Sequence, residues 1–170
     1  MKPPRHNIFN QIHQELRSLL NDTTHSIGRT DFTQPAQVRR AFNKIDDTLR
    51  LFNVHSKTEE EQLFPLLNSF APDIVMDFEQ QHLEDHQLCG KLRHIMRSYC
   101  TAKDQKAEQE FGRGLQEAFN VFANFNLAHM KKDEAVINEA LWQHYADQEL
   151  ISLEKALSEH LPTDQRQNIF

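Results

Sequence analysis

Histidine is over-represented in this chain, and its spacing relative to acidic residues suits metal binding. Ten of the 170 residues are histidine. Three of the histidines between residues 1 and 150 have a second possible metal ligand four residues further on, a spacing that stacks two side chains on one helix face. The pairs are His55 with Glu59, His82 with His86, and His129 with Asp133, and His13 is a single candidate of the same kind.

These seven residues interrupt stripes of apolar side chains. His13, for example, falls between Phe9 and Leu16 at helical spacing. Burial of an unpartnered polar group costs roughly 2–7 kcal/mol, and burial of a charge costs more. A single inward histidine is more often a hydrogen-bonded core residue than a ligand, and an isolated pair is usually solvated. Seven interruptions on four stripes favour a shared metal instead.

The residue types narrow the choice of metal. Imidazole nitrogen and carboxylate oxygen, without thiolate, suit iron, zinc, copper or nickel. A structural zinc needs only four ligands, and this set is larger. The donors therefore suggest two metal ions.

The elements that must position these residues are helices, because apolar residues recur at helical spacing almost throughout. Pro65 lies inside the second of them and should kink it or end it. The expected helices run from Phe9 to Leu20, from Pro35 to Leu67, from Pro72 to about Cys100 and from Phe111 to Leu141, with a polar connection from Asn21 to Thr33 and a shorter helical segment from Ala146 to Leu161.

Helices with one apolar stripe each can bury those stripes only against one another. We therefore expect an all-α fold, an antiparallel up-down four-helix bundle over about residues 7–142. A C-terminal helical extension over about 143–161 and a loose tail over 162–170 complete a single domain, 1–170. The extension, with Leu150, Leu153 and Leu157, is expected to dock on the bundle or to form a homodimer face.

Composition excludes several classes of protein. The net charge of −6 argues against a non-specific nucleic-acid binder, which needs a basic surface. No apolar run approaches the roughly 20 residues that span a bilayer, and residues 1–11 lack the apolar stretch of a secretory signal. Cys89 and Cys100 form no CxxC motif and no disulfide framework. We expect a cytoplasmic protein with no nucleic-acid or membrane partner.

The ordered set of motifs resembles the hemerythrin-like family, the HHE cation-binding domain. The matching pieces are His13 in IHQELR, HSKTE at 55–59 leading into LFP, HLEDH at 82–86, and HMKKDE at 129–134. Together they extend from about Ile12 to Leu141. Each piece is weak alone, but four in order on four expected helices are specific.

The resemblance implies a non-haem site with two iron ions, joined by an oxo or hydroxo bridge. Five histidines and two bridging carboxylates would hold the irons and leave one coordination position for a diatomic ligand such as dioxygen. Phenylalanines around the site would exclude water and favour a small apolar gas, and we expect this role for Phe52, Phe78, Phe122 and Phe125.

Two departures from the family pattern leave alternatives open. Asp133 and Glu134 are adjacent, and at 3.6 residues per turn they lie about 40° and about 140° from His129 around the helix. We prefer Asp133, with Glu134 as the alternative because the shorter side chain of aspartate reaches less far. Some relatives use one histidine on the third helix. If His82 or His86 is not a ligand, more positions are open and reactivity beyond gas binding is favoured.

Three functions are compatible with this sequence. The leading hypothesis is reversible binding of dioxygen, or of another diatomic, for sensing, storage or delivery. The second is a redox or stress protein that acts on nitric oxide, peroxide or iron-sulfur clusters. The third is a non-catalytic interaction module that the metal stabilises. A ferritin-like carboxylate protein is disfavoured, because only Glu79 to His82 provides the Glu-x-x-His element and Asn126 stands at the matching position before His129.

Other candidate residues receive a structural interpretation. Cys89 is expected to be a packed core thiol rather than a redox group. Five histidines lie off the apolar stripes and are expected at the surface or in local packing, namely His6, His25, His94, His144 and His160.

Overall fold

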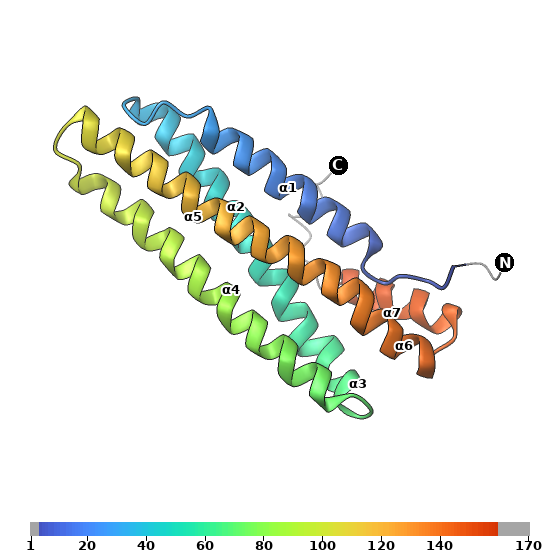
Figure 1. Cartoon of the computed structure of the whole chain (residues 1–170). Coiled ribbons are helices and arrows are strands. Elements are labelled where there is room, and N and C mark those ends of the chain that lie inside the picture. The colour runs from blue at the N-terminus through green and yellow to red at the C-terminus, as the bar shows by residue number, and fades with distance from the viewer. Residues whose placement is uncertain (1–3, 160–170) are drawn as a thin grey trace. The chain divides into compact units, whose positions relative to one another are not determined.

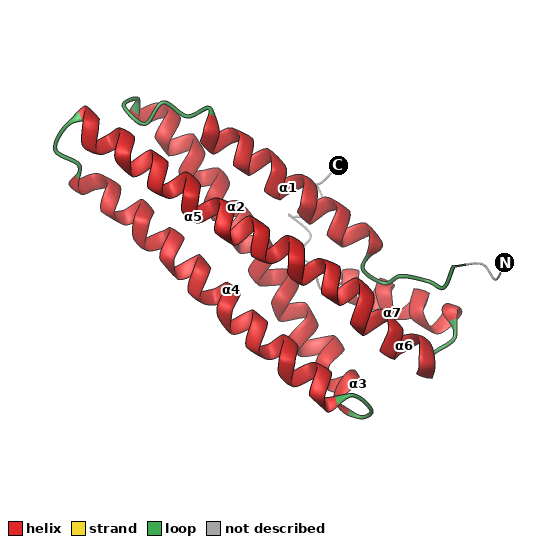
Figure 2. Cartoon of the chain, viewed as in Figure 1, coloured by secondary structure: helices red, strands yellow, loops and turns green. Residues whose placement is uncertain are grey.

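The structure is a computed structural model that describes residues 4–159. Within that range every regular element is helical and no strand is present (Figure 2). The expected tail at 162–170, the end of the last helical segment and His160 lie outside the described residues. The helices labelled in Figure 1 are α1 Asn10–Gly28, α2 Pro35–Thr58, α3 Phe64–Asn68, α4 Pro72–Ser98, α5 Gln105–Lys132, α6 Asn138–His144 and α7 Asp147–Glu159. Three short turns lie between them in the chain: the π-helical turn η1 Glu59–Leu63, the 3-10 turn η2 Tyr99–Thr101 and the π-helical turn η3 Asp133–Ile137.

The predicted helix starts at prolines are confirmed. α2 begins at Pro35 and α4 begins at Pro72. Proline suits the first turn because its ring fixes φ near the helical value and its missing N–H has no helical partner there. The start of α5 uses a side-chain cap instead, since the Asp104 carboxylate accepts a hydrogen bond of 2.8 Å from the Ala107 N–H.

The predicted end of the first helix is wrong, because α1 continues to Gly28 rather than stopping near Asn21. The buried face of α1 goes on through Thr23 and Ile27, which are 0% and 1% exposed. The Thr23 hydroxyl forms a 2.8 Å hydrogen bond with the Thr48 hydroxyl of α2. The buried face of α1 therefore continues through Thr23, because the hydrogen bond to Thr48 satisfies its buried hydroxyl.

The chain divides into two compact units, and α1, α2, α4 and α5 each contribute residues to both. The first unit contains Met1–Glu15, Asn53–His82 and Ala128–Phe170, and the second contains Leu16–Phe52 and Leu83–Leu127.

Among the described residues, no helix is both long and apolar enough to cross a membrane.

In the core of the first unit, Ile8 and Phe9 before α1 and Leu150 of α7 pack with residues of η1, α3 and α4. Leu150 of α7 is fully buried in it, and Leu153 and Leu157 pack against it, so the C-terminal extension docks within this unit. The buried members of this cluster are Ile8, Phe9, Leu63, Phe64, Leu67, Val75, Phe78, Ile137, Leu141 and Leu150.

Polar contacts also fasten the N-terminal segment to the start of α7. The Arg5 guanidinium donates to the backbone oxygens of Trp142 and Tyr145, at 2.9 and 2.6 Å. It also pairs with Asp147 at 2.6 Å. The Trp142 indole N–H in turn donates to the His6 carbonyl at 2.8 Å. These contacts satisfy carbonyls at the end of α6 that the helix leaves without partners.

The second unit has an aromatic and leucine core. The rings of Phe52 and Phe122 meet edge to face, with centroids 5.4 Å apart. Phe119 lies 5.6 Å from Phe122, and Leu49 and Leu115 are fully buried. Phe52 and Phe122 therefore belong to the core of this unit.

Two glycines of α5 provide a test of the packing in the second unit. A Cβ at position 112 would overlap the Phe32 ring, whereas nothing lies within 4 Å of a Cβ at position 114. We expect Gly112→Ala to lower the free energy of unfolding by about 1–3 kcal/mol, because the buried Phe32 ring must move. Gly114→Ala should raise it by about 1 kcal/mol, since alanine favours the helix. Urea unfolding of both variants measures this, and equal effects would contradict the close approach of Phe32.

Candidate metal centre

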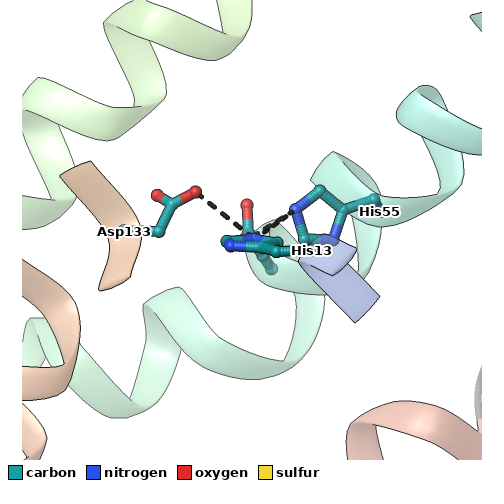
Figure 3. A group of neighbouring side chains, drawn as sticks. His13, His55 and Asp133 are labelled. Atoms are coloured by element: carbon teal, nitrogen blue, oxygen red, sulfur yellow. Dashed lines mark hydrogen bonds and ion pairs between the residues drawn. The ribbon is translucent and has the colours of Figure 1, made fainter. Parts of the chain in front are cut away.

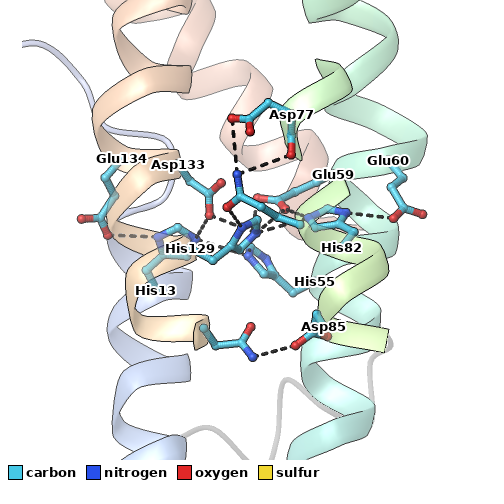
Figure 4. A network of polar contacts seen from close by, with 12 residues as sticks. His13, His55, Glu59, Glu60, Asp77, His82, Asp85, His129, Asp133 and Glu134 are labelled. Atoms are coloured by element: carbon cyan, nitrogen blue, oxygen red, sulfur yellow. Dashed lines mark hydrogen bonds and ion pairs between the residues drawn. The ribbon is translucent and has the colours of Figure 1, made fainter. Parts of the chain in front are cut away.

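Six side chains of residue types that can ligate a metal meet inside the first unit, each on its own helical segment or turn (Figure 4). Their exposed fractions lie between 0% and 6%, so all six are buried. Their nitrogens and oxygens fall into two groups, each with all its ligand atoms within 4.8 Å of one another, and Glu59 belongs to both groups. The six are His13 of α1, His55 of α2, Glu59 of η1, His82 of α4, His129 of α5 and Asp133 of η3.

The first group is formed by His13, His55, Glu59 and Asp133. The Nε2 atoms of His13 and His55 are 3.3 Å apart. Asp133 Oδ2 lies 3.7 Å from His13 Nε2, and Glu59 Oε1 lies 3.5 Å from His55 Nε2 (Figure 3 shows His13, His55 and Asp133). Two nitrogens and two oxygens therefore converge on one point.

The second group is formed by His82, His129 and the same Glu59. The Nε2 atoms of His82 and His129 are 3.3 Å apart, and Glu59 Oε2 lies 3.2 Å from His82 Nε2. Asp133 Oδ2 lies 3.5 Å from His129 Nε2. Glu59 thus presents one oxygen to each histidine pair, and Asp133 lies between His13 and His129.

The outward nitrogens of three of these histidines have oxygen partners. Nδ1 of His13 lies 3.0 Å from Glu134 Oε1, Nδ1 of His82 lies 2.8 Å from Glu60 Oε1, and Nδ1 of His129 lies 3.0 Å from Gln81 Oε1. An oxygen acceptor requires the proton on Nδ1, so the neutral ring carries a lone pair on Nε2. Outer hydrogen bonds of this kind orient histidines toward a metal.

The two central carboxylates are buried without hydrogen bonds. None of the four oxygens of Glu59 and Asp133 has a hydrogen-bond partner among the described residues. Buried polar groups normally have a hydrogen-bond partner, and two adjacent buried carboxylates that lack one are costly. Inward-facing imidazole lone pairs and carboxylate oxygens together are a donor set that fits divalent or trivalent metal cations.

The electrostatics of the two carboxylates differ. Burial raises the pKa of Glu59, but the neighbouring imidazoles of His55, His129 and His82 outweigh it and hold this pKa well below the usual value. Burial raises the pKa of Asp133 well above its usual value, and the nearby charge of Glu59 raises it further. Burial lowers the pKa of His82, but Glu59 and Glu60 outweigh it, and the net shift is upward.

Both central carboxylates stand at the first residue of a π-helical turn. The Phe64 N–H donates to the Glu59 carbonyl and the Asn138 N–H to the Asp133 carbonyl, five residues back in each case. Such turns are rare and occur frequently at functional sites. The structure interrupts the α-helical pattern ahead of Pro65, at η1, and Pro65 itself lies in the first turn of α3. η3 forms without a proline, so proline is not a general requirement for such a turn.

The sequence pattern gave no clear signal for these turns or for the outer partners. Glu60 and Gln81 are predicted by no spacing rule, although each directly follows or precedes a candidate ligand in the chain. Glu134 has the same relation to Asp133. Its carboxylate is 25% exposed and contacts the outer nitrogen of His13, whereas Asp133 is the residue that joins the central group.

The expectation that His86 points inward is wrong. His86 is exposed and belongs to neither group of converging ligands among the described residues. The buried face of α4 steps by three residues from His82 to Asp85 and then by four to Cys89. This heptad-like step turns position 86 toward solvent.

Asp85 and Cys89 form a separate buried contact in the second unit. Asp85 accepts a 2.6 Å hydrogen bond from the Asn126 amide, and the Cys89 thiol lies 3.7 Å from its other oxygen. Burial, together with the charge of Asp85, raises the pKa of Cys89 to about 12. A thiol held protonated at neutral pH is not a reactive redox group, in agreement with the prediction of a packed core cysteine.

The remaining described histidines are at the surface or in local contacts, as predicted. His25 and His94 are exposed, and exposed His144 stacks on Phe70. His6 is half-buried and pairs with Glu154 Oε2 at 2.7 Å.

Comparison with known proteins places this site in a family. Residues 6–141 match the hemerythrin HHE cation binding domain, and the chain belongs to this family. It is similar to F-box/LRR-repeat protein 5 of Salmo salar, with 21% identity over 164 residues, which cover 96% of this chain and 23% of that protein. The Mus musculus F-box/LRR-repeat protein 5 is 22% identical over 153 residues, 90% of this chain and 21% of that protein. The chain therefore spans only about a fifth of the length of these relatives.

The raised pKa values of Asp133 and His82 predict a pH-dependent stability of the metal-free protein. Groups whose pKa is raised on folding stabilise the folded state below their ordinary pKa, and this contribution is lost as the pH rises through the raised value. We expect the metal-free chain to lose stability as the pH rises above 3.8, the ordinary pKa of the Asp133 carboxyl, and to lose more as the pH rises above 6.5, the ordinary pKa of the His82 imidazole. Urea unfolding in the presence of a chelator measures the change.

Asp133→Asn should reduce this pH dependence, because it removes the buried ionisable group. Asp46→Asn, at an exposed position of α2, is the matched control and should leave the dependence unchanged. If the free energy of unfolding depended on pH equally in wild type and Asp133→Asn, Asp133 would not be the source of the pH dependence.

Proposed function

We propose that this protein holds two iron ions in the candidate centre and binds dioxygen, or another diatomic molecule, for sensing, storage or delivery. One observation carries the proposal, namely the two buried carboxylates without hydrogen bonds between two pairs of inward-facing histidines. Membership of the hemerythrin HHE family supports a cation at this position.

The donor set supports two ions rather than one. Glu59 belongs to both groups of ligand atoms and directs a different oxygen to each histidine pair. We propose His13, His55, Glu59, His82, His129 and Asp133 as the ligands. Glu134, Glu60 and Gln81 would hold the histidines in position through their outer nitrogens. Iron, bound by nitrogen and oxygen donors, would supply redox chemistry and affinity for small diatomics.

Aromatic rings support a small apolar ligand. Phe9 stacks on His13 with centroids 4.8 Å apart, and Phe64 stacks on His82 at 5.3 Å. Phe78 meets the His129 ring at 5.6 Å. Such a shell lowers the access of water to a metal centre and favours an uncharged gas over a charged substrate.

A second function is favoured by the exposure of His86. Without this histidine, the proposed ligand set is one imidazole smaller than the five-histidine set, so at least one further coordination position is open. This supports a redox or stress role on nitric oxide or peroxide as the alternative. Cys89 would take no part in such a reaction, because its thiol is buried and protonated.

For the fold, we propose that the helices form an antiparallel four-helix bundle and that the chain is one hemerythrin-like domain. The family match over residues 6–141 supports this architecture. The burial of Leu150 of α7 in the core of the first unit supports the inclusion of this helix in the same domain.

Anaerobic purification, followed by iron counting and visible spectroscopy, tests the function. We expect about two irons per chain, as the two ligand groups imply. A charge-transfer band that appears with oxygen and disappears on its removal supports reversible binding. Irreversible oxidation with turnover of peroxide or nitric oxide supports the alternative, and zinc or no metal contradicts both.

The ligand set is tested by a matched pair on α4. His82→Ala should lower iron content sharply, because it removes a buried donor, whereas His86→Ala should leave it unchanged. His55→Ala and Glu59→Ala should behave like His82→Ala, and His144→Ala like His86→Ala. Metal analysis of the purified variants is the measurement, with circular dichroism to confirm folding. A His86→Ala variant that loses as much iron as His82→Ala would restore the five-histidine set.

A further inference from the structure

A cavity of about 440 Å³ lies in the first unit beside the candidate centre. The N-terminal segment with the start of α1, the end of α2 and α7 form its walls. Its apolar lining includes Phe9 and Ile12 on one side and Ile151 and Leu157 of α7 on the other. His55 and Glu59 are the two lining residues that belong to the metal centre.

Burial changes from one end of this cavity to the other. His55 and Glu59 are 6% and 3% exposed, whereas Ile151 is 44% exposed and Lys155 is also exposed. The cavity therefore connects solvent to one edge of the centre.

The second histidine pair is not part of this lining. Neither His82 nor His129 contacts the cavity, and the rings of Phe64 and Phe78 pack against them instead. A molecule in the cavity would meet the His55–Glu59 edge and not the other pair.

The size and charge of the cavity define what it can hold. Its volume falls in the range of small-molecule sites and is well above the roughly 150 Å³ that accommodates benzene in an engineered cavity. The charged residues that line it are Glu15, Glu59 and Glu154 with a single lysine, Lys155, and Glu154 also pairs with His6. The excess of carboxylates repels anions, and the apolar walls favour uncharged groups.

We propose that this cavity is a binding site for a small, uncharged, mainly apolar organic molecule, which it holds against the His55–Glu59 edge of the centre. Only the identification of this edge as part of a metal site rests on the proposed function. Binding in the cavity itself requires no metal, because the apolar walls from Phe9, Ile12, Ile151 and Leu157 supply the contacts.

Benzene is a suitable probe, followed by methyl and histidine-ring NMR signals of the full chain. We expect saturable shifts of the Ile12, Ile151 and Leu157 methyl signals and of the His55 ring, with the Leu83 methyl and the His82 ring unchanged. Benzoate, which has the same ring with a negative charge, should cause no shift at the same concentration. Absence of benzene shifts, or stronger shifts with benzoate, would overturn the proposal.

A matched pair of variants locates the site. Ile151→Trp fills the cavity from α7 and should weaken benzene binding at least about tenfold, equivalent to about 1.4 kcal/mol. Leu83→Trp, at a 57% exposed position of α4, should bind benzene like wild type. Both positions are exposed enough to keep the fold, and circular dichroism checks this. Equal affinity in both variants would place benzene elsewhere and refute the site.

Iron content is measured on the same samples, so that the two proposals fail separately. Benzene binding without iron in any sample would leave the cavity site intact and contradict the proposed function. Iron at the expected level with no benzene binding would support the proposed function and contradict the cavity site.

Discussion

The close approach of two buried carboxylates to four imidazoles is the constraint on which the first unit depends. In the part of the chain that the structure describes, no oxygen of Glu59 or Asp133 has a hydrogen-bond partner. Glu59 lies within 4 Å of imidazole nitrogens from three helices, and Asp133 lies within 4 Å of imidazole nitrogens from two. Without a cation, this arrangement carries a large electrostatic cost, which the raised pKa of Asp133 reflects. The surrounding packing must hold the Glu59 and Asp133 carboxylates close together against the repulsion between their charges.

Two features of the structure hold the carboxylates and imidazoles in place, namely the π-helical turns and the contacts to the outer nitrogens of the histidines. The π-helical turns begin at the carboxylate residues themselves, so the same local change of geometry sets the position of Glu59 and of Asp133. Outside the centre, Glu134, Glu60 and Gln81 fix the outer nitrogens of three histidines. The rings are thereby oriented with Nε2 inward, which makes the centre preorganised for a cation.

The C-terminal helix gives this member of the hemerythrin HHE family a feature beyond its centre. α7 buries Leu150 in the core and is fastened at its start through Arg5 and Asp147. Its other residues form one wall of the cavity that ends at His55 and Glu59. The helix therefore contributes both to the stability of the first unit and to the surroundings of one edge of the centre.

The helical spacing of apolar residues was enough to predict an all-α fold. Prolines in the sequence predicted the starts of α2 and α4. The ordered motifs of histidine and acidic residues predicted the family. These properties depend on local spacing, which a sequence displays directly. Tertiary structure decided what spacing leaves ambiguous. From His82, steps of three and four residues are both compatible with a buried face, and packing turned Asp85 inward and His86 outward. Likewise Thr23 extended α1 because Thr48 of another helix meets its hydroxyl, and the partners of the outer nitrogens follow from contacts between helices distant in sequence.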